Sequence, residues 1–301
     1  VSSRGLLKSC YIHSPLPQSS CNIDKQYLLD IIQKKVSVFD GMSIYVCSDL
    51  LSFFVQYILP YIKNNFTLVS GDSDICVPIE ALNESLANRL ISNQYLIKWF
   101  AQNTRIQNDN KIIQLPIGID YHTILSNPQH NWKNDNEGYL PIEQENILFQ
   151  IKNNSKPFYE RKLTKIYVNF SVNSDRFGQR KNALNIIPPN LIFYNNNFTK
   201  RTQLWEEMSQ YAFILSPFGI GMDCHRTWEA LALGCIPIVK AINFTTMFKD
   251  LPVLIVSDWN EINTELLEKT ILNFKKLYLT NKFNYDKLSL NYWTNLINNQ
   301  F

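Results

Sequence analysis

Short apolar runs alternate along the first half of the chain with stretches in which apolar residues recur every three or four positions. Strands are predicted at 43–47, 66–70 and 112–115, where apolar and β-branched residues stand between turn signals. Helices are predicted between them, over 49–62 and 80–91. Alternation of this kind is typical of β-α-β units, whose strands are parallel. The first half is therefore expected to form a parallel α/β unit.

A polar region then interrupts the pattern. Between His130 and Pro157 the chain is rich in Asn, Lys, Gln and Glu with interspersed Pro and Gly, which is typical of a linker, although a helix over about 143–153 would fit there. After it the alternation restarts. Strands are predicted at 165–170, 191–194, 212–215, 236–239 and 253–256, and helices at 179–184, 202–208, 224–233 and 264–277.

Two modules agree with the length of the chain, because 301 residues exceed the roughly 100–200 residues of a single domain. We predict an N-terminal domain over 1–150 and a C-terminal domain over 151–301, both Rossmann-like with parallel sheets. Ligands of such sheets bind beyond the carboxyl ends of the strands.

Composition narrows the class of protein. The net charge of +3 comes from 29 basic and 26 acidic side chains without a long Lys/Arg run, so we expect no nucleic-acid partner. No apolar stretch reaches the roughly 18 residues that span a bilayer, so we expect no membrane span. The six cysteines lack CxxC spacing, which argues against a zinc site and for a reducing, cytoplasmic compartment. They are Cys10, Cys21, Cys47, Cys76, Cys224 and Cys235.

The alternative location is the lumen of an organelle. The sequence does not start with Met, so it would also fit the luminal domain of a membrane-anchored enzyme whose anchor has been removed.

The most informative segment runs from 213 to 239 and reads as strand, loop, helix, stop and strand. Gly219 and Gly221 in the loop allow positive φ and a close approach of a ligand to the backbone, and Asp223 suits an N-cap. Gly234 fits the position just after the helix. A helix N-terminus offers free N–H groups and the positive end of a dipole, so this loop is expected to bind an anion.

Three side chains of this helix extend the expected site. Arg226 in the first turn is a bidentate donor suited to a diphosphate. Glu229 lies three positions beyond Arg226 and four beyond His225, so all three can lean toward one face. A carboxylate there can accept hydrogen bonds from two vicinal hydroxyls, as ribose presents. In the alternative interpretation, His225 and Glu229 form only a helix salt bridge, and the loop is an ordinary β-α-β turn.

The run DCHRTWEALALGCIPIV over 223–239 resembles the C-terminal signature of exostosin-type glycosyltransferases, in which an Arg precedes Glu-Ala-Leu and Gly-Cys-Ile-Pro follows. The resemblance implies a GT-B fold, with two Rossmann-like domains whose sheets face a cleft. It implies a nucleoside-diphosphate sugar donor held by the C-terminal domain and an inverting transfer without an essential metal or other cofactor. Arg226 and Glu229 carry over as donor-binding residues, whereas Cys224 stands where many members have Ser.

The acceptor would be a hydroxyl of a glycan or glycoconjugate bound on the side of the N-terminal domain. In GT-B enzymes generally, the loop after the first strand of the second domain faces the donor phosphates. Asn173, Arg176 and Arg180 are therefore candidate ligand contacts. The alternative is a solvated loop, since a short cationic stretch is usually surface.

The transfer also needs a base that takes the proton of the acceptor hydroxyl, a role that Asp, Glu or His suits. Asp120 and His122 follow a predicted strand near the domain junction, and Asp72 and Asp74 follow another. One of these four is expected to be the base. Asp120 could instead cap a turn, and His122 could fill a hydrogen-bonded pocket.

Two other functions remain open. Asp72 and Asp74 form an Asp-x-Asp, which in a metal-dependent GT-A transferase would hold Mn²⁺ or Mg²⁺ against the diphosphate. A lone Asp-x-Asp also commonly forms a turn through Asx hydrogen bonds. The second alternative is a catalytically silent carbohydrate-binding or assembly protein, because a fold does not prove activity.

Overall fold

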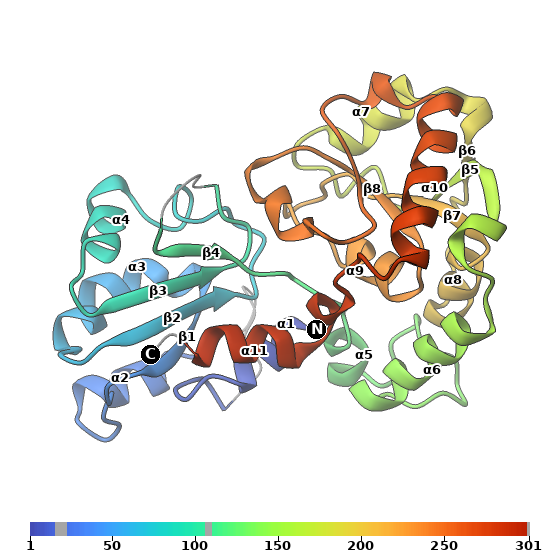
Figure 1. Cartoon of the computed structure of the whole chain (residues 1–301). Helices are drawn as coiled ribbons and strands as arrows, with labels where there is room; N and C mark the ends of the chain where they lie inside the picture. Colours follow the sequence, from blue (N-terminus) through green and yellow to red (C-terminus); the bar gives the residue numbers. More distant parts are fainter. Residues whose placement is uncertain (16–22, 106–109, 300–301) are drawn as a thin grey trace. The chain divides into compact units, whose positions relative to one another are not determined.

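The computed structural model describes residues 1–15, 23–105 and 110–299, and the chain divides into two compact α/β units (Figure 1). Unit 1 comprises Val1–Ile117, Gly221–Asp223 and Ser289–Phe301, and unit 2 comprises Gly118–Ile220 and Cys224–Leu288. The contacts thus place 118–150 with unit 2, whereas the sequence pattern suggests a boundary at 150. The reason is helix α6 (Pro141–Asn154), which lies in the polar region but packs against α8 and α9 of unit 2.

Unit 1 is built on a parallel sheet whose four strands follow the chain in the order β1-β2-β3-β4. Three of these strands are predicted by the sequence pattern, and β3 is not. Lys98 interrupts its apolar run, and only four residues separate it from the preceding helix. The strands are β1 (Met42–Cys47), β2 (Phe66–Gly71), β3 (Leu96–Ala101) and β4 (Ile112–Gln114).

The predicted helix over 49–62 is helical but not continuous. It begins with the 3₁₀ turn η1 (Ser48–Leu50), continues through α3 (Leu51–Phe53) and the wider π turn η2 (Phe54–Ile58), and ends in η3 (Leu59–Tyr61). Pro60 explains the irregular end, because proline lacks an N–H and its ring clashes with the carbonyl four residues earlier. The other helices are α1 (Ser3–Lys8), α2 (Gln26–Ile32), α4 (Glu84–Ile91) and α11 (Leu290–Asn298).

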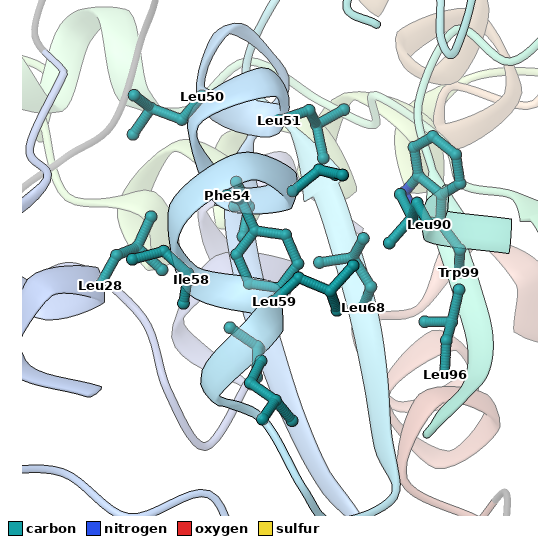
Figure 2. Close-up of a cluster of buried hydrophobic side chains, with 14 of the residues drawn as sticks. Leu28, Leu50, Leu51, Phe54, Ile58, Leu59, Leu68, Leu90, Leu96 and Trp99 are labelled. Atoms are coloured by element: carbon teal, nitrogen blue, oxygen red, sulfur yellow. The ribbon is translucent and has the colours of Figure 1, made fainter. Parts of the chain in front are cut away.

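The core of unit 1 lies between this interrupted helix and the sheet (Figure 2). Leu51 and Phe54 of the helix are fully buried, as is Leu68 of β2. Trp99 of β3 is buried beside them and donates its indole N–H to Ser70 Oγ at 2.9 Å. Burial of each such side chain contributes roughly 1.5–3 kcal/mol. The figure also labels Leu28, Leu50, Ile58, Leu59, Leu90 and Leu96 of the same cluster.

Unit 2 carries five parallel strands in the order β6-β5-β7-β8-β9. The chain starts in β5, adds β6 on one side and then crosses to add β7 on the other. The sheet therefore has a topological switch point between β5 and β7, where doubly wound sheets bind ligands. The strands match the predicted ones within a few residues: β5 (Lys162–Val168), β6 (Ile192–Tyr194), β7 (Tyr211–Leu215), β8 (Ile236–Lys240) and β9 (Leu254–Val256).

Helices cover this sheet through amphipathic faces, with α10 packed against β5, α8 against β7 and α9 against β8. The four helices predicted after the polar region are all present. A short helix, α5, that the pattern does not predict begins at His122. The helices are α5 (His122–Ser126), α7 (Gln179–Ile186), α8 (Arg201–Met208), α9 (His225–Ala232) and α10 (Thr264–Leu279), with 3₁₀ turns η4 (Phe158–Glu160), η5 (Pro189–Leu191), η6 (Asn243–Phe248), η7 (Trp259–Glu261) and η8 (Tyr285–Leu288).

Two sequence expectations concern the chain as a whole. Across the described ranges, no helix combines the length and apolarity needed to cross a bilayer. Five cysteines lie in these ranges with free thiols, while Cys21 lies outside them.

Candidate functional site

Two arginines meet at the topological switch point of unit 2. Arg180 of α7 and Arg226 of α9 both lie over the ring of Phe170, with Cζ 5.5 Å and 5.4 Å from the ring centroid. Phe170 follows β5, which ends at Val168 rather than at residue 170. Backbone carbonyls hold the two guanidinium groups: Arg180 Nη1 donates to Ser171 O at 2.9 Å, and Arg226 Nη2 donates to Asn169 O at 2.7 Å.

This pair carries excess positive charge. Within the described ranges, neither Arg180 nor Arg226 forms an ion pair with a carboxylate. Arg180 is 9% exposed, and its Nε has no hydrogen-bond partner there. Burial, followed by the charge of Arg180, lowers the pKa of Arg226 below its ordinary value. The charge of Glu229 acts on Arg226 in the opposite direction, but more weakly than burial and Arg180. A buried and a half-buried guanidinium group without an ion pair to a carboxylate in the described ranges form an arrangement that an anion stabilises.

The N-terminus of α9 lies at the same place, but its cap differs from the prediction. The N-cap is Cys224, whose side chain makes no capping hydrogen bond to the first amide groups of the helix. The prediction that Asp223 caps α9 is wrong: Asp223 belongs to unit 1, and its carboxylate accepts a hydrogen bond from Ile117 N at 2.8 Å. Thr227 in the first turn contacts Ser216 at the end of β7, Oγ1 to Oγ at 2.8 Å.

The glycines of the loop act through their small size and not through their φ angles. Positive φ occurs at Gly234, as predicted for the residue after α9, but not at Gly219 or Gly221, so that part of the prediction is wrong. A Cβ on Gly219 would press against Arg180 Nη2 and lie 3.0 Å from its Cζ. A Cβ on Gly221 would lie 2.8 Å from Asp74 Oδ1 within unit 1.

Glu229 is 8% exposed and lies about one turn after Arg226 on α9. Its carboxylate has no hydrogen bond or ion pair to any residue of the described ranges, so the alternative of a His225–Glu229 salt bridge is wrong. Its charge is among those that raise the pKa of Tyr121 above its ordinary value, after burial and Glu145. Glu229 is therefore a nearly buried acceptor whose bonding capacity is unused.

The loop between β5 and α7 contains one residue that the sequence analysis overlooked. Asp175 accepts hydrogen bonds from the amides of Gln179, Arg180 and Lys181 at 2.8, 2.8 and 3.0 Å. These amides at the start of α7 are thus already satisfied by a carboxylate. Asn173 and Arg176, also predicted as ligand contacts, are exposed, and Arg176 lies over the Phe177 ring.

A second cluster of unit 2 brings together three predicted residues. Asp120 is 6% exposed, and His122 Nδ1 lies 3.1 Å from its Oδ1. The rings of His122 and His225 are 5.8 Å apart between centroids, and His225 Nδ1 lies 2.7 Å from Gly118 O. Burial alone would raise the pKa of Asp120, but His225, His122 and Arg201 outweigh it and lower that pKa well below its usual range. An ionised carboxylate therefore faces two histidines next to Arg226.

The other two base candidates lie in unit 1. Asp72 has a φ of 56°, directly after β2, and its Oδ2 pairs with Arg4 Nη1 at 2.8 Å. The Asp72 side chain is only 4% exposed. Asp74 is exposed. The two carboxylates of the Asp-x-Asp thus differ in environment, and the described ranges contain no group of three or more His, Cys, Asp or Glu side chains arranged to hold a metal ion.

Comparison with known proteins gives no assignment. No protein-family profile matches the chain, and a search of curated proteins found no match. The function is therefore inferred from the geometry of unit 2.

Proposed function

We propose that the protein is a GT-B-type glycosyltransferase that moves a sugar from a nucleoside-diphosphate donor to a hydroxyl of a glycan or other acceptor, with inversion and without a metal. The observation that carries this proposal is the Arg180–Arg226 pair. Two guanidinium groups share one aromatic ring at the switch point of a doubly wound sheet, next to a helix N-terminus and without an ion pair to a carboxylate of the described ranges. Diphosphate is an anion whose size and charge suit two such forks.

Glu229 would bind the nucleoside half of the donor. It follows Arg226 by three positions on α9, which places both side chains on neighbouring parts of one helix face. A nearly buried carboxylate that accepts no hydrogen bond from the described residues is costly unless a ligand supplies hydrogen bonds. Two vicinal ribose hydroxyls would supply them, whereas a bare phosphate would not.

The acid–base half of the reaction is assigned to His122 with Asp120. His122 keeps 28% of its side-chain surface exposed, while Asp120 behind it is buried and ionised. His122 would accept the proton of the acceptor hydroxyl, whose oxygen attacks the anomeric carbon from the face opposite the leaving group. The bond from that carbon to the diphosphate oxygen breaks, and Arg180 and Arg226 stabilise the negative charge of the departing diphosphate.

The first test is ligand binding. Wild-type protein is screened by thermal shift with UDP, GDP, ADP, CMP and dTDP, because a ligand stabilises by about 2.7 kcal/mol at a concentration of 100 Kd. One diphosphate is expected to stabilise wild-type protein and to have little effect on Arg180→Met/Arg226→Met. The matching sugar nucleotides are then assayed for hydrolysis and transfer.

The outcomes separate the three functions. If no nucleotide stabilises the wild-type protein, the donor site is wrong. Specific binding without turnover of any sugar nucleotide would support the catalytically silent alternative. Activity that EDTA abolishes and Mn²⁺ restores would support the metal-dependent alternative at Asp72 and Asp74.

A further inference from the structure

The loop that carries Asp120 and His122 is fixed from several sides within unit 2. Three carbonyl groups hold its backbone: that of Gly118 contacts His225 Nδ1, that of Asp120 accepts from Arg201 Nη1, and that of Tyr121 accepts from Gln144 Nε2 at 3.0 Å. The carbonyl groups of a surface loop ordinarily bond to water. Here they meet side chains of α6, α8 and α9, so the position of the loop is set by three helices.

Arg201 is the centre of this arrangement. It is the first residue of α8 and is 6% exposed. Its guanidinium group lies between two indole rings, with Cζ 4.9 Å from the centroid of Trp132 and 5.7 Å from that of Trp205. The group donates to Gln144 Oε1 at 3.1 Å, and its Nη2 lies 3.5 Å from Asp120 Oδ2. Stacked rings and fixed acceptors leave this side chain little freedom.

The Asp120 carboxylate connects Arg201 to His122. Oδ1 accepts from Thr123 N at 2.9 Å and lies 3.1 Å from His122 Nδ1, while Oδ2 accepts from Thr123 Oγ1 at 2.7 Å and faces Arg201. With both oxygens occupied, the carboxylate cannot rotate without losing hydrogen bonds. The contact between Nδ1 and Oδ1 has the distance of an ion pair but not the geometry of a hydrogen bond. The negative charge of the carboxylate favours the histidine tautomer whose proton is on the facing nitrogen, Nδ1.

We infer that Arg201 is a positioning residue: through Asp120 it fixes the ring of His122 with the proton on Nδ1, which leaves Nε2 as the basic nitrogen. The order of groups is an exposed imidazole, a buried carboxylate behind it and a buried guanidinium behind the carboxylate. Outer groups of this kind set the orientation and basicity of a functional histidine. The catalytic meaning of this arrangement rests on the proposed function, but the orientation of His122 does not.

Other charged groups near His122 enter the test. His225 of α9 faces the ring directly, and two acids lie close to Tyr121: Glu145 of α6, 3.4 Å from its hydroxyl, and Glu229 of α9. Because these charges also act on His122, the primary measurement is the tautomer, which reports on the group that faces Nδ1.

The experiment is nuclear magnetic resonance of the full chain labelled with ¹⁵N in histidine. Only four histidines occur, His13, His122, His130 and His225, so the ring signals of His122 are assigned by their loss in His122→Gln. Above the titration range, wild-type His122 is expected to show a single neutral tautomer protonated at Nδ1. Arg201→Met should shift both ring nitrogens toward the average of two tautomers. Asp120→Asn should remove the Nδ1–H pattern completely.

Matched variants keep the inference testable. Arg161→Met also removes a guanidinium group that holds backbone carbonyls of unit 2, those of Lys156 and Leu233, and should leave the His122 signals unchanged. If Arg201→Met does not fold, Arg201→Lys keeps the charge without the planar fork and should give an intermediate pattern. An unchanged His122 tautomer in a folded Arg201 or Asp120 variant overturns the inference.

A kinetic measurement applies once a donor and an acceptor are known. Arg201→Met is expected to lower kcat by about 10- to 100-fold, the usual size of losses from outer-shell groups. It should leave the affinity for the nucleoside diphosphate unchanged, and Arg201→Lys should recover part of kcat. If wild-type protein binds no nucleotide, the proposed function is contradicted. The inference about the His122 tautomer is not, because that measurement needs no nucleotide.

Discussion

At the scale of single residues, the arginines of unit 2 show which charge is available to a ligand. Arg161 donates to two backbone carbonyls and lies 3.1 Å from Cys235 Sγ, and Arg201 is held by Asp120 and Gln144. Arg180 and Arg226 each have one carbonyl acceptor and share an aromatic ring. The first two are satisfied by the protein, whereas the second two gain most from an added anion.

Glu229 and Arg226 are expected to contribute separately to donor binding. Glu229→Gln should weaken the binding of a nucleoside monophosphate and of a nucleoside diphosphate alike, because the carboxylate that is lost accepts hydrogen bonds from the ribose of both. Arg226→Lys should weaken the binding of the diphosphate selectively, by roughly 1.5–3 kcal/mol of binding free energy, because the ammonium group keeps the charge but not the bidentate fork. Isothermal titration calorimetry of nucleoside, monophosphate and diphosphate into both variants measures these differences.

The matched control for this pair is Lys181→Gln. Lys181 is exposed on α7 directly after Arg180, so this change removes one positive charge from the same helix without touching the pair. Its affinities should equal those of wild-type protein. If Arg226→Lys and Glu229→Gln also bind all three ligands as wild-type protein does, α9 does not hold the donor.

Asp120 is expected to make the stability of unit 2 depend on pH in the acid range. Its pKa in the folded protein is lowered, because neighbouring cations outweigh burial, so its contribution is complete above the unfolded value of about 3.9. That contribution is lost as the pH falls from there through the folded pKa. Asp120→Asn leaves Arg201 buried and uncompensated and should cost about 3–5 kcal/mol at pH 7.

Urea denaturation of wild-type protein and Asp120→Asn between pH 7 and pH 2 measures this effect. The difference in unfolding free energy should shrink as the pH falls below about 4. A difference that does not change with pH would mean that Asp120 is not ionised in the folded protein.

At the scale of elements, the sequence predicts those helices and strands whose apolar residues follow a regular local pattern. All five strands of unit 2 and α7 to α10 appear within a few residues of their predicted ranges, because each is a regular apolar run between turn signals. Helices α1 and α2 and strand β3 are not predicted, since they are short or interrupted by charged residues. Their apolar positions gain meaning only from packing in unit 1.

The site follows the same division. Arg226 and Glu229 could be found because both lie on one helix, and Arg180 because it follows a strand in a predicted loop. Phe170 and Arg201 could not be found, because their roles depend on residues far away in the chain: Arg201 meets Asp120, 81 positions earlier. Trp205, one helical turn after Arg201, is the one local signal for a stacked arginine.

Gly219 is expected to tie the loop after β7 to the start of α7. In Gly219→Ala, the new Cβ would occupy the space of Arg180 Nη2 and lie 3.3 Å from Ser174 O. The end of an arginine can move, so the variant should fold with a small loss of stability but bind the nucleoside diphosphate at least about tenfold more weakly, the equivalent of 1.4 kcal/mol. Calorimetry and thermal unfolding measure the two effects.

Gly178→Ala is the control for this change. Gly178 precedes α7 with φ 67°, and a Cβ there meets nothing within 4 Å among the described residues. It should cost about 1 kcal/mol of stability through backbone strain, while diphosphate affinity changes little. The opposite result, normal binding in Gly219→Ala and weak binding in Gly178→Ala, would show that backbone shape, not the position of Arg180, controls the site.

At the scale of the whole molecule, the chain does not keep to the order of its units. After completing unit 2 at Leu288 it returns to unit 1, where α11 packs against α1 and β1. Trp293 and Ile297 of α11 are buried, and a Cβ on Gly5 of α1 would lie 2.9 Å from a methyl group of Leu290. Residues 289–299 are therefore part of the first unit, which no linear division into two halves predicts.

This path leads to a prediction about local stability. Trp293→Ala should leave a large cavity beside α1 and β1 and lower the stability of unit 1 by about 3–5 kcal/mol. Amides of β1 to β4 that exchange by opening of unit 1 should then exchange more than a hundredfold faster, since each 1.4 kcal/mol is a factor of ten. Trp259 lies in the core of unit 2, so Trp259→Ala should instead accelerate the exchange of amides in β5 to β9. Hydrogen exchange read by mass spectrometry compares the two variants peptide by peptide. Equal acceleration of all nine strands in both variants would show that the chain opens as one cooperative body, and that the return of α11 to unit 1 gives that unit no stability of its own.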